Sequence, residues 1–304
     1  MFRSMLTRGR SGHNERMEIT HPEQLWWPDE GIRKRDAIDY YRAVAPALLP
    51  HVRDRPLTIK QHYNGPRSPY RWLKDAPPEL PPWIAVSPQP AKSRGGRPVR
   101  YVVVRREREL LWLVNYGAID LHVWPSRIDR PDRPDHVLFD LDPFDVPFAE
   151  VVRVALQLRE ALAALGLASY LKTTGGEGLH VHVPVARRHT HAETRRFAEV
   201  VGGALARTNR LVTTKRSLSS GRGILIDTAM NGHGQQVVSV YSLRPLPGAP
   251  VATPLRWEEV DERLDPRALT PARVLERVER HGDLFAPVLR GRQLLRPALA
   301  KLSV

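Results

Sequence analysis

The chain of 304 residues contains no cysteine. This absence excludes disulfide bonds, zinc sites built on thiolates and a cysteine nucleophile. Long apolar runs are missing as well, because no stretch approaches the ~20 residues with which a helix crosses a bilayer. The first 16 residues are basic but lack the apolar core of a secretory signal, so we expect a flexible basic extension there and a cytoplasmic, nucleoid-associated protein.

Acidic residues are in the minority. The chain has 47 Lys and Arg against 33 Asp and Glu, which gives a net charge of +14 and a pI near 10.5. A field of this sign attracts polyanions, and nucleic acid is the expected partner. The alternative is an arginine-rich composition without a functional meaning. The hydrophobic content of 41% is ordinary for a globular protein with a real core.

Helix and strand patterns alternate along the chain. Apolar spacing predicts helices over 37–49, 109–118, 148–167, 190–209 and from 270 onward. Strands are predicted over 55–63, 98–107, 136–145, 169–185 (with a glycine turn inside) and 222–230. The proline-dense stretch 65–90 predicts a surface loop carrying Tyr70, Trp72 and Trp83. The chain therefore predicts a mixed α/β fold in which residues 17–304 form a single domain of two interleaved lobes around a cleft.

The stretch "HVLFDLDPFD" (136–145) places two acids in an apolar strand. Side chains two apart share one face of a strand, so Asp140 and Asp142 repel each other and call for a positive group. Asp227 ends another apolar strand, "GILID". Three such carboxylates could hold two Mg or Mn ions ~3.5–4 Å apart. An acidic alternation on an exposed strand face is the alternative.

The stretch "KTTGGEGLHVH" combines three glycines with two histidines. Gly175, Gly176 and Gly178 let backbone amides approach an anion closely, which predicts a phosphate cradle. His180 and His182 face one side of the following strand, although a zinc site would need further ligands. A tight hairpin with an ordinary polar face explains the same pattern.

Together, "LHVWPSRIDRPDRPDHVLFDLDP", "KTTGGEGLHVHVP" and "ILIDTAMNGHGQQVVSVYSLRP" resemble the polymerase domain of bacterial ligase D, in the archaeo-eukaryotic primase superfamily. The resemblance covers roughly residues 17 to 295. No ligase or phosphoesterase motif is present, which suggests a stand-alone form. The resemblance implies a two-lobed primase-like fold, with central β-sheets around an active-site cleft and flanking helices.

The resemblance also implies roles for single residues. The catalytic and metal-binding residues would be Asp140, Asp142 and Asp227. The residues that bind the incoming nucleotide would be Lys60, His122, Thr174, His180 and Arg244. The residues that contact DNA would be Lys34, Trp72 and Lys74.

Several positions depart from the family pattern. Glu177 stands where many members have lysine, so it weakens triphosphate binding, turns outward or accepts a bond from a neighbouring base. Arg71 replaces the first residue of an aromatic pair. In the pocket for a downstream 5′-phosphate, His21 and Gln24 replace two family residues and only Lys34 is kept.

The leading hypothesis is a template-directed nucleotidyltransferase that extends primer ends with NTPs or dNTPs, using two Mn or Mg ions. By resemblance alone it acts in DNA repair by end joining, prefers ribonucleotides and manganese, and partners with DNA, Ku and a separate DNA ligase. One alternative is a DNA-binding module with weak or no polymerase activity. Another is a metal-dependent nuclease built on the same acids, which leaves the phosphate cradle unexplained.

Overall fold

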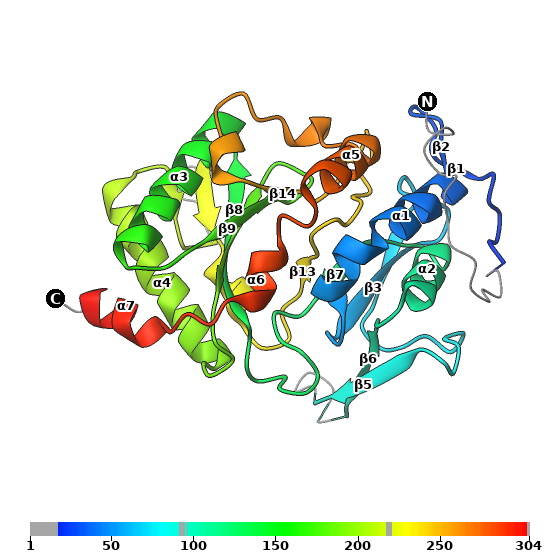
Figure 1. Ribbon diagram of the computed structural model, residues 1–304, viewed down its shortest axis with the longest axis horizontal. Coiled ribbons are helices and arrows are strands. Elements are labelled where there is room, and N and C mark those ends of the chain that lie inside the picture. Colours follow the sequence, from blue (N-terminus) through cyan, green and yellow to red (C-terminus); the bar gives the residue numbers. More distant parts are fainter. Residues whose placement is uncertain (1–17, 91–94, 96, 217–220, 303–304) are drawn as a thin grey trace.

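The computed structural model describes residues 18–90, 95, 97–216 and 221–302, so the predicted extension over residues 1–16 lies outside the described residues. Figure 1 shows two lobes, each with its own sheet, and the mixed α/β prediction is confirmed. Over the part of the chain that the structure describes, no helix has the length and apolarity to cross a membrane.

The first lobe contains a sheet with the strand order β13-β7-β3-β6-β5, in which β4 also pairs with β3. Helix α1 (Lys34–Val52) and helix α2 (Glu107–Asn115) pack beside this sheet, and the short hairpin of β1 (Leu25–Trp27) and β2 (Ile32–Arg33) precedes them. The predicted helices 37–49 and 109–118 are confirmed. The predicted strands 55–63 and 98–107 correspond to β3 and β6. The strands of this sheet are β3 (Leu57–His62), β4 (Tyr70–Leu73), β5 (Ala85–Gln89), β6 (Val99–Val103), β7 (Ala118–Val123) and β13 (Val237–Val238).

The prediction that residues 65–90 form only a surface loop is wrong, because β4 and β5 lie within them. Strand β5 is at the edge of the sheet, where the missing amide of Pro88 breaks no ladder hydrogen bond that a neighbour needs. The aromatic residues of this stretch do lie at the surface: Tyr70, Trp72 and Trp83 are 48%, 47% and 38% exposed.

The second lobe contains the sheet β11-β12-β8-β10-β9-β14. Its long central strand β8 is buried from His136 to Leu141, which explains the apolar run around the acids. The other strands are β9 (Tyr170–Thr173), β10 (Leu179–Pro184), β11 (Val212–Thr213), β12 (Gly223–Ile226) and β14 (Pro254–Leu255); β8 itself is His136–Phe144. The predicted strand 222–230 ends early, because Asp227 caps a 3₁₀ helix over Thr228–Asn231.

Two helices cover the outer face of this second sheet (Figure 1). Helix α3 (Phe148–Ala164) ends before Gly166, whose φ of 79° suits the left-handed turn that stops a helix. Helix α4 (His191–Thr208) begins with the predicted capping box, in which the Thr190 hydroxyl accepts from the Glu193 amide at 3.2 Å. Both helix predictions are confirmed.

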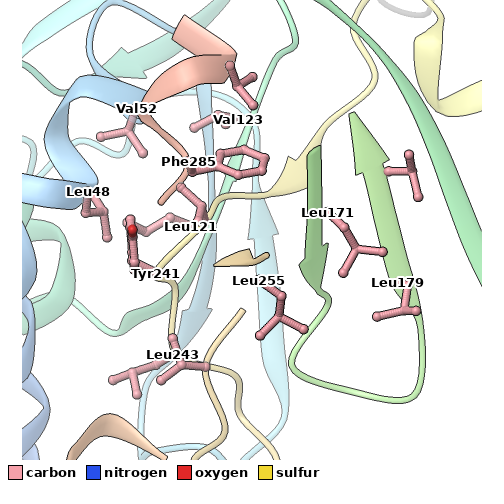
Figure 2. Close-up of a cluster of buried hydrophobic side chains, with 14 of the residues drawn as sticks. Leu48, Val52, Leu121, Val123, Leu171, Leu179, Tyr241, Leu243, Leu255 and Phe285 are labelled. Atoms are coloured by element: carbon pink, nitrogen blue, oxygen red, sulfur yellow. The ribbon is translucent and has the colours of Figure 1, made fainter. Parts of the chain in front are cut away.

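The C-terminal part of the chain is helical, as predicted, and it crosses between the lobes (Figure 1). It contains α5 (Pro271–His281), α6 (Ala286–Arg290) and α7 (Leu295–Leu302). Between α5 and α6, the ring of Phe285 lies 5.5 Å from that of His51 in the first lobe and 5.0 Å from that of His182 in the second. Figure 2 shows Phe285 among side chains of both sheets, including Leu121 and Leu171. One continuous apolar cluster therefore fixes the two sheets relative to each other.

Candidate functional site

Strand β8 and the end of β12 bring the three predicted catalytic carboxylates together. Asp140 lies opposite His180 of β10, and Asp142 lies opposite Leu225 of β12. Asp227 follows β12 directly, and its backbone amide donates to the Asp140 carbonyl at 2.8 Å. The two acids of β8 are two residues apart and share a face, so the antiparallel register places Asp227 beside them.

The three charges perturb one another. The pKa of Asp142 is raised to about 7, first by burial and then by the negative charges of Asp140 and Asp227. Arg216 acts in the opposite direction, and its guanidinium lies 2.7 Å from the Asp227 carboxylate. Arg216 is thus one positive group of the kind that the pair of aspartates requires, and sequence reasoning did not identify it.

The donor set suits a hard divalent cation, although the side chains are not arranged as a closed cage. Among the described residues, no three His, Asp or Glu side chains form a group that could hold a metal ion. One oxygen of Asp140, Oδ1, is buried and makes no hydrogen bond with the described residues, so its lone pairs are available to a cation. Carboxylate oxygens with surplus negative charge are the ligands that Mg and Mn prefer.

A neutral histidine, His180, lies beside the carboxylate of Asp140, and a buried lysine, Lys172, lies next to it in the sheet. His180 Nε2 lies 3.1 Å from Asp140 Oδ1 without the alignment of a hydrogen bond. Burial, followed by the charge of Lys172, lowers the pKa of His180 to about 4, so the ring is neutral. Lys172 pairs with His180 across β9 and β10 and is itself buried, which lowers its pKa to about 7. Sequence reasoning missed Lys172, although it stands beside the glycine motif.

The glycine turn is held from inside by Thr174. Its hydroxyl accepts from the backbone amides of Gly176 and Gly178, each at 3.2 Å. Gly175 has φ 73°, and a Cβ there would lie 2.5 Å from Cγ of Arg244. The turn therefore needs glycine both for its backbone conformation and for its close approach to Arg244.

Glu177 points away from this turn. Its side chain is 74% exposed, and its carboxylate accepts from Arg267 at 3.1 Å. Two of the three interpretations of this acid thus hold together: it turns outward, and it accepts a bond from a neighbouring base.

In the first sheet, Asp120 of β7 connects the predicted nucleotide-binding groups. Its Oδ2 atom lies 3.3 Å from Lys60 Nζ and 2.9 Å from His122 Nε2. The Nε atom of Arg244 lies 3.9 Å from the same oxygen. Burial alone would raise the pKa of Asp120, but His122, His62 and Lys60 hold it well below its usual range. Sequence reasoning missed Asp120, and the signal available was an acid two residues before His122 in an apolar strand.

Arg244 joins the two halves of the site. One guanidinium nitrogen donates to the Thr174 carbonyl at 2.6 Å, while Nε faces Asp120. Burial lowers the pKa of Arg244, and the charges of Asp120 and Asp140 raise it. A single cation thus lies between the glycine turn of the second sheet and the basic cluster of the first.

Strand β4 presents the predicted DNA-contacting aromatic residue next to this cluster. Trp72 lies opposite Lys60 in the sheet, and its ring centroid is 5.0 Å from that of His122. Lys60 Nζ also lies 4.3 Å from the ring centroid of Tyr70. Lys74 follows β4 and is exposed. A half-exposed indole beside the basic cluster offers a face on which a base can stack.

The predicted 5′-phosphate residues form a second cluster at the start of α1. The Lys34 amide donates to the Gln24 carbonyl at 2.9 Å, and the Gln24 amide donates to the His21 carbonyl at 3.0 Å. The Lys34 side chain is buried, with Nζ donating to the Thr20 hydroxyl at 2.8 Å. Burial lowers the pKa of Lys34 to about 8. The structure brings these residues together, with the lysine set inside rather than on the surface.

Comparison with known proteins gives consistent relatives. The family model described as LigD, primase-polymerase domain, matches residues 33–285. The multifunctional non-homologous end joining DNA repair protein LigD of Mycobacterium tuberculosis is 31% identical over 290 residues, covering 90% of this chain and 37% of that protein. LigD of Mycolicibacterium smegmatis is 29% identical over 282 residues (90% and 36%), and the bifunctional LigD of Bacillus subtilis is 27% identical over 282 residues (91% and 45%). The chain thus spans less than half the length of these relatives.

A solved structure agrees with the sequence comparisons. The polymerase domain of Mycobacterium tuberculosis ligase D, determined in complex with DNA, superimposes with a TM-score of 0.84 at 27% identity. The match covers 92% of this chain and all of that chain. The archaeo-eukaryotic primase-like architecture expected from the sequence is therefore confirmed. The chain belongs to the family of LigD primase-polymerase domains, which are nucleotidyltransferases, and the relatives just named are non-homologous end joining proteins.

Proposed function

We propose that this protein adds nucleotides to the 3′ end of a DNA primer under the direction of a template strand. The observation that carries the proposal is the placement of two groups of opposite charge around Arg244. Three carboxylates lie on β8 and after β12, and a basic cluster lies on β3 and β7. Nucleotidyl transfer requires this combination, because cations at the reacting centre and basic groups at the triphosphate neutralise different charges.

The carboxylates Asp140, Asp142 and Asp227 would hold the divalent ions. When bound, two such ions lower the pKa of the primer 3′-hydroxyl and neutralise charge on the departing pyrophosphate. The raised pKa of Asp142 supports this role, because surplus negative charge among the three acids makes cation binding favourable. The exposed side chain of Arg216 provides partial neutralisation at Asp227 until the ions bind.

The triphosphate would lie against the basic groups of both sheets. Arg244 and Lys60 supply fixed positive charges, and the backbone of the turn that Thr174 organises supplies amides. His180 is neutral, so it would contact the triphosphate as a hydrogen-bond donor rather than as a cation. His122, oriented by Asp120, would contact the sugar and phosphates of the incoming nucleotide.

The DNA would be held by Trp72 and Lys74 near the site and by Lys34 at the start of α1. Glu177 does not oppose triphosphate binding in this arrangement, because its carboxylate is directed to Arg267. From the names of the relatives, we further propose a cellular role in end joining at broken DNA in the cytoplasm. We also propose Ku and a DNA ligase as partners, as the resemblance of the sequence motifs implies.

One observation favours a second candidate function. Arg216 already pairs with Asp227, and the described acids do not form a ready group of three ligands. A DNA-binding module with weak or no polymerase activity would not need a metal site, so these two features are compatible with it. The two candidates differ in nucleotide binding, because a pure DNA binder has no reason to bind a triphosphate with Mn.

Primer extension tests the proposal. We would compare ribo- and deoxynucleotides with Mn or Mg for the wild type, the double variant Asp140→Ala/Asp142→Ala, and the control Asp261→Ala, which removes an exposed acid paired with Arg263. The proposal predicts templated extension by the wild type and the control, and a loss of at least ~100-fold in the double variant. No extension by folded wild type that still binds DNA, together with no triphosphate binding, would favour the DNA-binding module.

A further inference from the structure

A groove rich in arginine lies at the end of β8 that is remote from the carboxylates. Its volume is about 630 Å³, and it lies between the segment before β8, the segment after β10 and the end of α6. We call it the arginine groove after the six arginines that line it, which are Arg127, Arg130, Arg187, Arg188, Arg290 and Arg292. None of these residues was assigned a role by the motifs.

Two of the six arginines are fixed in place by acids. Arg187 makes a two-pronged contact with Asp129, at 2.8 and 2.6 Å. Arg127 lies 3.6 Å from Asp135 and donates to the Pro50 carbonyl at 3.1 Å. The carboxylate of Asp135 also lies 2.5 Å from the guanidinium of the buried Arg55. It therefore neutralises the charge of Arg127 only in part. These contacts give the groove a rigid wall that is already positive.

The other four arginines of the groove have no acidic partner among the residues that the structure describes. Arg130, Arg188, Arg290 and Arg292 are exposed, and within the described residues no hydrogen bond or ion pair involves their guanidinium groups. Four free guanidinium groups around one groove repel one another and raise the local potential. Burial and the charges of Arg55 and Arg187 lower the pKa of Arg127 to about 10, which agrees with a crowded positive field. Such a site is stabilised by an anion with many negative charges.

The position of the groove separates it from the nucleotide site. Residue His136 begins β8 beside the groove wall, and Asp142 lies six residues further along that strand. At ~3.3 Å per residue, the groove is roughly 13 Å from Asp140 and roughly 20 Å from Asp142. These distances correspond to about four to six base pairs of duplex at 3.4 Å per pair, too far for the triphosphate of a nucleotide bound at the carboxylates.

We propose that the arginine groove binds the phosphate backbone of DNA as a second contact, distinct from the nucleotidyl-transfer site. Guanidinium groups match phosphate oxygens in a two-pronged geometry, and several of them around one groove match a backbone with many phosphates rather than a single small anion. The inference extends the proposed function, but its test uses neither metal nor nucleotide. A failure of the groove and a failure of catalysis are therefore distinguishable.

The test compares two triple variants of equal charge. Arg130→Ala/Arg188→Ala/Arg292→Ala empties the groove of three free charges, whereas Arg196→Ala/Arg207→Ala/Arg210→Ala removes three exposed arginines on α4 and just after it. Binding of a labelled duplex of about 20 base pairs is followed by fluorescence anisotropy between about 50 and 200 mM salt. Circular dichroism confirms that both variants are folded.

The proposal predicts a specific loss in the groove variant. Its affinity at about 100 mM salt falls by at least ~10-fold, and the slope of log K against log salt becomes shallower by about two to three, since each phosphate contact contributes ~0.9. The control variant keeps the wild-type slope, and the lysine version of the groove variant recovers most of the affinity because it keeps the charge. An unchanged slope in the groove variant, or an equal loss in both alanine variants, would overturn the proposal.

Discussion

At the scale of single residues, the buried carboxylate of Asp120 orients three groups that we assign to the nucleotide. Lys60, His122 and Arg244 all approach the same oxygen. The carboxylate itself is fully buried, so its own charge is tolerated only because these partners surround it. A change at Asp120 should therefore affect both the stability of the protein and the geometry of the site.

We predict that Asp120→Asn lowers the free energy of unfolding by about 3 kcal/mol. The amide keeps the shape of the side chain but leaves the cations of Lys60 and Arg244 without their negative partner. Unfolding by urea measures this loss, and titration with a nucleotide triphosphate should show weaker binding. The control Asp261→Asn breaks an exposed contact with Arg263 and should leave the urea midpoint unchanged. A loss below ~1 kcal/mol would mean that water already solvates the two cations.

Lys34 gives a prediction that depends on pH. Burial lowers its pKa to about 8, so the charged form is lost as the pH rises through 8 rather than near the usual 10.5. If Lys34 binds a 5′-phosphate, the advantage of phosphorylated over unphosphorylated DNA ends should fall by up to ~10-fold per pH unit above 8. Binding measured between about pH 7 and pH 9.5 tests this.

The matched variant for that experiment is Lys34→Arg, which keeps its charge over the whole range. We expect its preference for the 5′-phosphate to be independent of pH. No preference for a 5′-phosphate in the wild type at neutral pH would remove Lys34 from the DNA-binding residues.

Residue-scale reasoning from sequence found the motif residues but not the groups that orient them. Asp140 and Asp142 stood out because two acids in an apolar strand are unfavourable without a partner. Asp120 and Lys172 did not, because their meaning depends on which strands are neighbours. Only the pairing of β3 with β7 brings Lys60 to Asp120, and only the pairing of β9 with β10 places Lys172 opposite His180.

At the scale of elements, the turn between β9 and β10 provides the sharpest prediction. Gly175→Ala would place a Cβ 2.5 Å from Cγ of Arg244 at a φ of 73°. We predict a loss of about 1–3 kcal/mol of stability from backbone strain. Arg244 must also move, so nucleotide affinity should fall by at least ~10-fold, which corresponds to about 1.4 kcal/mol.

The neighbouring Gly176 supplies the control. A Cβ there meets its nearest atoms at 3.6 Å, an ordinary contact, and its φ lies outside the left-handed region. Gly176→Ala should therefore leave the free energy of unfolding close to that of wild type, and nucleotide affinity within about twofold of wild type. If the two substitutions have equal effects, contact with Arg244 is not the cause, and the turn excludes a side chain at both positions for another reason.

Helices and strands could be predicted where the apolar period was long, and the predictions failed where proline interrupted it. The helices α3 and α4 and the strand β8 follow from their apolar patterns. Strands β4 and β5 do not, because each has few residues and β5 carries Pro88. An edge strand needs hydrogen bonds on one side only, so proline is compatible with it, but the sequence alone does not reveal which strands lie at the edge.

At the scale of the whole molecule, the site depends on the position of one sheet relative to the other. The carboxylates belong to the second sheet and the Asp120 cluster to the first, and Arg244 reaches both. The apolar cluster of Figure 2 lies between these sheets, with Phe285 in contact with His51 and His182. We therefore propose that the two lobes fold as one unit, as the sequence suggested for residues 17–304.

This proposal predicts how two buried phenylalanines behave. Phe285→Ala removes a ring between the lobes, whereas Phe197→Ala removes a ring from α4 that packs on Phe139 inside the second lobe. Each should cost about 3–5 kcal/mol, because each leaves a cavity in a close-packed core. If the lobes unfold together, both variants lower hydrogen-exchange protection equally in β3 of the first lobe and β10 of the second.

Independent lobes would give a different pattern of exchange. Phe197→Ala would then weaken protection in β10 and leave β3 unchanged, while Phe285→Ala would separate the lobes without unfolding either one. In that case nucleotide affinity would fall in the Phe285→Ala variant although both sheets stay protected, because Arg244 and the carboxylates would no longer be held at a fixed distance from Asp120. Measuring exchange and nucleotide affinity on the same two variants thus decides whether the interlobe core maintains the fold itself or only the alignment of the two halves of the site.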